Sequence, residues 1–194
     1  MPDSSKSVVI LCGPNGAGKS TAARDLLHGV LKVDQFVNAD TIATGLAGFA
    51  PEAAAFQARK IMADRLHALA ARGEDFAFET TLAGRSLAVW LQDDLNPRGY
   101  ATHLVYLWLP SPELAVARVG ARVRMGGHSI PDATIRRRYD RSIQNFVALY
   151  RGLVSDWRVY NNGTSEGPRL VAKGSGTRDP VVLRSEDWRR IHER

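Results

Sequence analysis

A glycine-rich segment near the start of the chain has the residue types and spacing needed to bind phosphate groups. It fits the pattern G-x-x-x-x-G-K-[ST], with Lys19 and Ser20 at the last two fixed positions. Glycines let the backbone turn with its N–H groups directed inward, into a concave anion-binding nest. The lysine ammonium can reach the outer phosphates, and the hydroxyl can ligate Mg²⁺. The pattern predicts a nucleoside triphosphate site, with ATP bound by Gly13, Pro14, Asn15, Gly16, Ala17, Gly18, Lys19, Ser20 and Thr21.

The residues on either side of this motif support the prediction. Residues 8–12 form a short apolar run, which is typical of a strand buried on both faces of a parallel sheet. A helical pattern follows, and a helix that begins near Gly18 would direct the positive end of its dipole at the phosphates. A strand, a phosphate-binding turn and a helix in this order argue against a simple glycine turn that binds nothing.

Two acidic residues follow predicted strands and are candidates for the chemistry of phosphoryl transfer. Asp40 ends the second predicted strand, where a carboxylate could take the proton of an acceptor hydroxyl; alternatively, it could be the N-cap of the next segment. Glu79 closes the third predicted strand and could either hold Mg²⁺ through water or bind an acceptor hydroxyl. Three residues that follow it are weaker candidates for the acceptor pocket: Thr80, Thr81 and Arg85.

Arginines on both sides of a loop with two glycines and a proline form a second group of candidates. Arg124 precedes this loop and Arg138 follows it. The loop, at about residues 124–133, is predicted to be a lid that closes over the triphosphate and supplies positive charge to the transition state. For most arginines in this region a solvated helix face is the simpler interpretation. His128, inside the loop, could contact phosphate or merely order the loop.

The elements that would position these residues alternate between strands and helices. Apolar and β-branched runs predict strands at 33–40, 75–81 and 101–110, and three short strands between 156 and 185. Helices are predicted at 52–72, 86–95, 111–123 and 186–194, while 41–51 is predicted to be a connection. A further helix after the lid has one apolar face, because apolar residues recur there every three or four positions: Ile135, Tyr139, Ile143, Phe146 and Tyr150.

This alternation predicts an α/β fold. We expect a three-layer α/β/α sandwich with a mostly parallel sheet, of the P-loop NTPase or kinase type. The composition is ordinary for a globular protein, with 44% hydrophobic and 24% charged residues. No linker, repeat or low-complexity tract divides the chain, so residues 1–194 are predicted to form a single domain.

Composition also bears on location and partners. The single cysteine, Cys12, lies in the first predicted strand and is expected to be a core residue. Without a signal-peptide pattern or a long apolar stretch, the chain is predicted to be cytoplasmic and to have no membrane contact. The net charge of +6 could serve either nucleic acid or a phosphate pocket. Because the aromatic residues after the lid share the apolar stripe, they argue against a nucleic-acid surface.

The order of the motifs resembles the zeta-toxin family of P-loop kinases, in its short chromosomal branch. The resemblance covers Val8 to Lys173 and rests on the segments GPNGAGKST, VNADTIA, FETTLAGRS, RVRMGGHSIPDATIRRRYDRSIQNF and DWRVYNN. It implies a kinase that uses ATP and Mg²⁺ to phosphorylate a hydroxyl. In the better-studied members this is the sugar 3′-hydroxyl of UDP-N-acetylglucosamine.

The resemblance also implies roles for individual residues. Lys19 and Ser20 would bind the phosphates and the metal, Asp40 would be the base and Glu79 would contact the acceptor. Arginines beside the lid would clamp the γ-phosphate. The implied partner is a small-molecule acceptor, and the resemblance leaves room for a separate antitoxin protein.

Other functions fit parts of the sequence. The phosphate-binding motif also resembles that of ABC transporter ATPases, but the chain has neither an LSGGQ-type signature nor a strand ending in Asp-Glu. A polynucleotide or nucleoside kinase would use the basic surface. A non-catalytic nucleotide-binding protein is the remaining alternative, if Asp40 does not face the phosphates.

Overall fold

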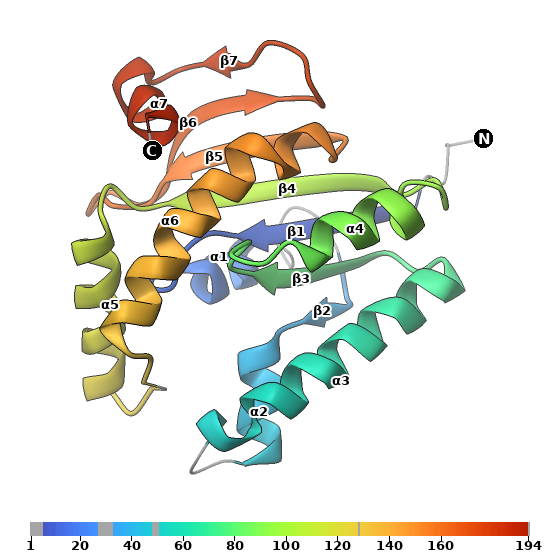
Figure 1. The fold of residues 1–194 in the computed structure, drawn as a ribbon, viewed down its shortest axis with the longest axis horizontal. Coiled ribbons are helices and arrows are strands. Elements are labelled where there is room, and N and C mark those ends of the chain that lie inside the picture. Colours follow the sequence, from blue (N-terminus) through green and yellow to red (C-terminus); the bar gives the residue numbers. More distant parts are fainter. Residues whose placement is uncertain (1–5, 27–32, 48–50, 128, 194) are drawn as a thin grey trace.

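The computed structural model describes residues 6–26, 33–47, 51–127 and 129–193. These residues contain a seven-stranded sheet in the order β2-β3-β1-β4-β5-β6-β7 (Figure 1). The strands are β1 (Ser7–Cys12), β2 (Phe36–Val37), β3 (Phe76–Thr80), β4 (Ala101–Trp108), β5 (Asp156–Asn161), β6 (Arg169–Gly174) and β7 (Val181–Val182). The first five strands pair in parallel, and β6 and β7 are antiparallel to their neighbours. The predicted mostly parallel sheet is therefore confirmed.

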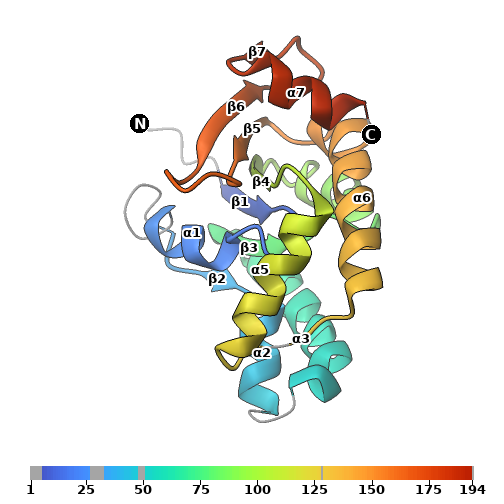
Figure 2. The same ribbon diagram turned by 90° about the vertical axis from the view of Figure 1, so that its left-hand side faces the viewer.

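Helices cover both faces of this sheet, as predicted. They are α1 (Lys19–Leu26), α2 (Ala39–Leu46), α3 (Pro51–Arg72), α4 (Ser86–Trp90), the π-helical turn η2 (Leu91–Leu95), α5 (Pro112–Arg124), α6 (Asp132–Ala148), the 3₁₀ turn η3 (Tyr150–Gly152) and α7 (Ser185–His192). Helix α1 lies on one face, while α3, α4 and α6 lie on the other (Figures 1 and 2). None of the helices in the described ranges is both long and apolar enough to cross a membrane.

The central strand β1 is buried on both faces of the sheet. Residues Val8–Cys12 are each at most 3% exposed. A strand between two helical layers must be apolar on both sides, which is why its sequence is a continuous apolar run. Burial raises the pKa of the Cys12 thiol well above its ordinary value, so this cysteine stays protonated and behaves as a core residue, as predicted.

Helix α6 is held firmly against the sheet. Its predicted apolar face is confirmed, because Ile135, Tyr139, Ile143 and Phe146 are all fully buried. The Tyr139 hydroxyl donates to the Leu109 carbonyl oxygen at 2.6 Å. Tyr150 is also buried but lies beyond the helix, in η3. The side chains that α6 directs away from the sheet are therefore fixed in position by its packing.

The prediction that residues 41–51 form a connection is wrong. Helix α2 begins at Ala39 and continues to Leu46, and β2 has only two residues. Asp40 therefore lies in the first turn of a helix rather than at the end of a strand. Two threonines and Gly45 give this segment a weak helix propensity, and the helix is stabilised by packing of Ala43 against α3. The predicted helix 86–95 is also interrupted, because α4 continues as the π-helical turn η2.

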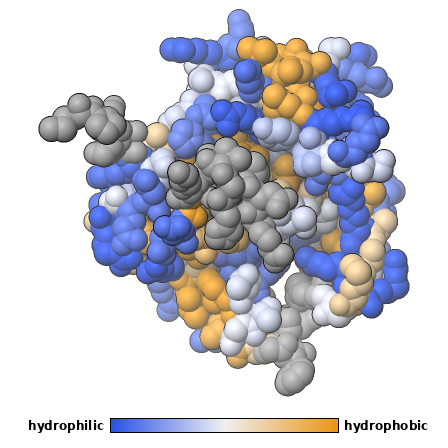
Figure 3. Space-filling view, turned by 180° about the vertical axis from the view of Figure 1, so that it is seen from behind, coloured by the Kyte–Doolittle hydropathy of each residue, from blue (hydrophilic) through white to orange (hydrophobic). Residues whose placement is uncertain are grey.

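An apolar cluster lies on the edge of the sheet that is far from the phosphate-binding loop. Val181, Val182 and Leu183 are 56%, 38% and 55% exposed. Figure 3 views the molecule from behind and shows apolar surface at the top, where β7 lies in Figure 1. The strand at this edge has only two residues, and a short edge strand offers little backbone for pairing with another chain.

Candidate active site

The glycine-rich loop between β1 and α1 packs closely against two neighbouring segments. Gly13 has φ +139°, and a Cβ atom added there would lie 2.2 Å from the Leu107 carbonyl oxygen. Gly18 has φ +79°, and a Cβ atom there would lie 2.8 Å from the Asn162 amide nitrogen. Both the backbone conformation and the available space therefore require glycine. These positions shape the loop into the turn that the sequence predicts.

Lys19 is held inside this loop. Its side chain is only 6% exposed, and its Nζ atom donates to the carbonyl oxygens of Gly13 and Pro14 at 3.0 Å each. The same ammonium lies 3.6 Å from a carboxylate oxygen of Glu79. Burying an ammonium group is costly unless it has such hydrogen-bond and ion-pair partners. The loop thus fixes a positive charge at the site predicted for phosphate.

Glu79 connects the loop to the neighbouring strand. It pairs with Leu11 in the parallel register of β1 and β3, which brings the end of β3 beside the loop. One carboxylate oxygen accepts hydrogen bonds from the Ser20 hydroxyl and the Asn38 side-chain amide, both at 2.7 Å. A hydroxyl and a carboxylate are the oxygen ligands that Mg²⁺ prefers. Ser20 and Glu79 therefore fit a magnesium site.

Asn38 is a site residue that we did not predict from the sequence. Its side-chain oxygen caps α2 by accepting from the backbone N–H groups of Asp40, at 2.7 Å, and Thr41, at 3.3 Å. Its amide nitrogen donates to Glu79. One buried side chain thus links the start of α2 to the Glu79 carboxylate. The preference of helix N-caps for asparagine was a sequence signal that could have identified it.

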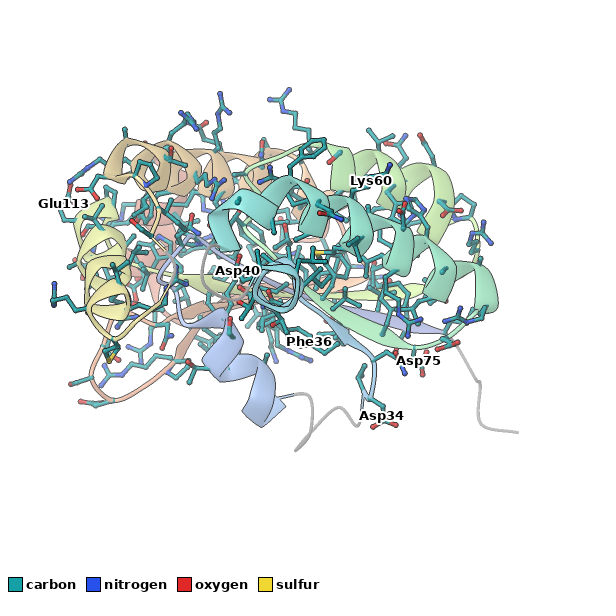
Figure 4. The ribbon with its side chains drawn as sticks, turned by 90° about the horizontal axis from the view of Figure 1, so that it is seen from below. Asp34, Phe36, Asp40, Lys60, Asp75 and Glu113 are labelled. Atoms are coloured by element: carbon teal, nitrogen blue, oxygen red, sulfur yellow. The ribbon has the colours of Figure 1, made fainter. Side chains whose placement is uncertain are left out.

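A cavity of about 660 Å³ brings most of the predicted residues together. Segments from the glycine-rich loop, α2, α3, β3, α4 and α6 line it. Among the predicted site residues, its lining includes Asn15, Lys19, Asp40, Glu79, Thr80, Thr81 and Arg138. Asp40 lies at the start of α2, exposed to the cavity, and is labelled in Figure 4. Hence the carboxylate predicted to be the base and the predicted phosphate-binding lysine face the same space.

Outside the glycine-rich loop, two predicted residues that the structure describes do not line the cavity. Arg85 is exposed at the start of α4, and Arg124 is exposed at the end of α5; neither lines the cavity. His128 lies outside the described residues, so the predicted lid at 124–133 is described only in part. Arg85 and Arg124 are close to the motifs in sequence, but their helices direct them elsewhere.

In the described part of the chain four arginines line the cavity, and only Arg138 among them was a predicted site residue. Arg138 is accompanied by Arg137 and Arg141 from α6, and by Arg59 from α3. Burial lowers the pKa of the Arg138 guanidinium below its ordinary value, and the charges of Arg59 and Arg137 lower it further. The carboxylate of Asp40 acts in the opposite direction. A group of cations that repel one another in a half-buried place favours the binding of an anion.

The loop that follows Glu79 is anchored to α6 and η3. The Asn145 amide donates to the Leu82 carbonyl oxygen at 2.7 Å, and the Tyr150 hydroxyl donates to the Gly84 carbonyl oxygen at 2.6 Å. Burial raises the pKa of Tyr150 to about 12, so this hydroxyl remains a donor. Leu82 is buried with φ +55°, an uncommon conformation for a residue with a side chain. These contacts hold Thr80 and Thr81 at the cavity wall.

A second contact missed from the sequence lies on the other side of the glycine-rich loop. The Asn162 amide, just beyond β5, donates to the Ala17 carbonyl oxygen at 2.8 Å. Arg118 of α5 in turn donates to the Asn162 carbonyl oxygen at 2.8 Å. Since the partners are up to 145 residues apart in sequence, no local pattern could have identified this support.

Solved and curated proteins similar to the chain include the following three. An uncharacterized protein from Haemophilus influenzae is 29% identical over 131 residues, which are 68% of this chain and 91% of that protein. The crystal structure of AvrRxo1-ORF1:-ORF2 with ATP superposes with a TM-score of 0.70 at 16% identity over 96% of this chain. The chain spans 63% of the length of that protein. The PezAT chromosomal toxin–antitoxin system of Streptococcus pneumoniae superposes with a TM-score of 0.63 at 14% identity, covering 98% of this chain and 86% of that chain.

A match to a protein-family model identifies the family of the chain. The model described as AAA domain matches residues 8–148. This range includes the glycine-rich loop, both candidate acids and the arginines of α6. Because the match covers well over half of the chain, the protein belongs to the AAA-domain family.

Proposed function

We propose that the protein is an ATP-dependent kinase that transfers the γ-phosphoryl group to a hydroxyl of a small molecule. The observation that carries the proposal is the cavity itself, which Lys19 of the phosphate-binding loop, the Asp40 carboxylate and the arginines of α6 line together. Phosphoryl transfer requires a phosphate cradle, positive charge around the transferred group and a residue that orients the acceptor. The cavity offers a candidate for each.

The two acids take different roles in this proposal. Glu79 is engaged by Ser20, Asn38 and Lys19, so it belongs to the phosphate and metal side of the site. No hydrogen bond occupies the Asp40 carboxylate within the described part of the chain, and its side chain is open to the cavity. Asp40 can therefore accept the proton of an incoming hydroxyl. Magnesium, held beside Ser20 and Glu79, would neutralise charge on the phosphates.

The proposed acceptor is a nucleotide sugar such as UDP-N-acetylglucosamine. The support is the motif order shared with the zeta toxins, together with a fold similar to the PezAT toxin–antitoxin system. A nucleotide sugar is anionic, which suits a cavity lined by four arginines. We also propose a separate partner protein, because both similar structures are two-component systems by name.

The polynucleotide-kinase alternative receives no support from the aromatic residues after the lid. Tyr139, Phe146 and Tyr150 are fully buried, so they cannot form a stacking platform for nucleic-acid bases.

A phosphorylation screen tests the proposed function. The purified protein is incubated with ATP, Mg²⁺ and panels of nucleotide sugars, nucleosides and short oligonucleotides, and products are detected by mass spectrometry. We expect a mass increase of one phosphoryl group on a nucleotide sugar. Phosphorylation of an oligonucleotide instead would favour the polynucleotide alternative. ATP binding without transfer to any acceptor would favour the non-catalytic alternative.

Replacing Asn38 by serine tests the link between α2 and Glu79. A serine hydroxyl can still cap α2, but it is too short to donate to Glu79. We expect thermal stability to change little, while turnover falls and the Mg²⁺ concentration for half-maximal activity rises by about 10- to 100-fold, as is typical for residues that orient metal ligands. Asn38→Ala is the comparison: losing the cap as well should cost about 1 kcal/mol of stability. A wild-type Mg²⁺ dependence in Asn38→Ser would contradict the linking role.

A further inference from the structure

The two ends of the cavity differ in chemistry. The end beside the glycine-rich loop is charged: it holds Lys19, Asp40 and Glu79, and the arginines of α6 begin beside it. The other end is lined by apolar side chains from three elements: Met62 and Leu66 of α3, Phe78 of β3, and Leu87 and Trp90 of α4. Phosphate chemistry uses only the first end, so the apolar end requires a separate explanation.

The residues of α3 that line the cavity give an estimate of its length. These lining residues lie on one face and begin at Ala55; among them, Arg59 lies at the charged end and His67 at the apolar end. These two residues are eight positions apart, which at 1.5 Å per residue is about 12 Å. Helix α3 ends just before β3 begins, so the later part of α3 lies toward the start of β3 (Figure 1). A molecule that fills both ends of the cavity must therefore extend past the site of phosphoryl transfer.

Trp90 presents a ring surface at the apolar end. Its ring packs 6.2 Å from that of Phe78 and 5.0 Å from that of His67, measured between centroids. The indole N–H is already used, because it donates to the Asp94 carboxylate at 2.8 Å. Trp90 can therefore offer apolar contact but no hydrogen bond. Among the side chains named at this end only His67 offers a hydrogen bond to a ligand, so a charged or heavily hydroxylated group placed here would lose water and gain few partners.

We propose that this apolar end is a subsite for an uncharged ring or other apolar group of the acceptor. The acceptor is then an elongated molecule, with its reactive hydroxyl at Asp40 and the apolar group farther along α3. The proposal rests on the proposed function for the identity of the reactive end. The subsite itself is a property of binding and needs no phosphoryl transfer.

Paired ligands test the subsite by binding alone, without ATP. The pairs are UDP-N-acetylglucosamine with N-acetylglucosamine 1-phosphate, and 4-nitrophenyl N-acetylglucosaminide with N-acetylglucosamine. In each pair only the first member carries a ring beyond the sugar. Affinities come from calorimetry, and the indole N–H signal of Trp90, assigned with Trp90→Phe, reports contact by NMR. We expect the ring-bearing member to bind at least tenfold more tightly and to shift that signal.

Two adjacent residues of α3 provide matched variants. Met62 lines the apolar end, whereas its neighbour Ile61 is 37% exposed and does not line the cavity. Met62→Lys should abolish the advantage of the ring-bearing ligand, and Ile61→Lys should preserve it. Equal affinity within the pairs, no binding by any ligand, or the same effect of both substitutions would overturn the subsite. Failure of the kinase proposal would appear differently, as ring-dependent binding without any phosphorylated product.

Discussion

Replacing Lys19 by alanine is expected to abolish phosphoryl transfer and to weaken ATP binding while the protein stays folded. Lys19 is the one side-chain cation that the phosphate-binding motif itself supplies, and its Nζ atom lies within the loop, 3.0 Å from two carbonyl oxygens. Removing a charge that stabilises the transferred phosphoryl group costs about a thousandfold in rate. Two carbonyl groups lose a donor as well, so we expect a stability loss on the order of 1–3 kcal/mol.

The control for this variant is Lys60→Ala. Lys60 is exposed on α3 and does not line the cavity, so its removal changes the net charge equally without touching the phosphate site (Figure 4). Turnover and ATP affinity are measured for both variants, with circular dichroism to check folding. If Lys19→Ala retained the turnover of Lys60→Ala, the proposed kinase activity would be wrong.

The sequence predicted well those features that depend on short stretches of chain. The strand, loop and helix around Lys19 follow one another directly in the sequence. The strand could be predicted because a parallel strand buried on two faces requires a continuous apolar run. The apolar face of α6 was equally clear from its spacing. In both cases the residues that determine the structure lie within one short, continuous segment of the chain.

The features that the sequence did not predict depend on contacts between distant segments. Helix α2 has little intrinsic helix propensity and is stabilised by α3 and by the Asn38 cap. Arg59 lies in an alanine-rich helix without any motif, and only the packing of α3 beside α2 and β2 brings it to the cavity. Arg85 and Arg124 show the reverse: proximity to a motif in sequence does not determine the direction of a side chain.

Replacing Asp40 by asparagine is expected to lower turnover by about a hundredfold or more while leaving ATP affinity within a few-fold of wild type. The substitution keeps the size of the side chain and one oxygen but removes the negative charge that accepts the acceptor proton, and losing a general base costs about 10²- to 10⁴-fold. Asp40 does not contact the phosphate-binding loop through any hydrogen bond that the described residues show. Its backbone N–H keeps its bond to Asn38, so α2 should lose only about 0.3–1 kcal/mol from the change in charge near its N-terminus.

Glu79→Gln is the matched acidic variant, because it makes the same chemical change at the second acid of the site. Glu79 accepts from Ser20 and Asn38 and faces Lys19, so its neutralisation should raise the Mg²⁺ requirement and weaken MgATP binding. The two variants should therefore differ in the step that they impair. Asp40→Asn should lower the rate of transfer within the bound complex, whereas Glu79→Gln should weaken binding of the metal–nucleotide complex. The opposite result, in which Asp40→Asn loses MgATP binding but keeps its rate at saturation, would make Asp40 a metal ligand. The acceptor hydroxyl would then have to be oriented by Glu79, and the division of roles between the two carboxylates would be reversed.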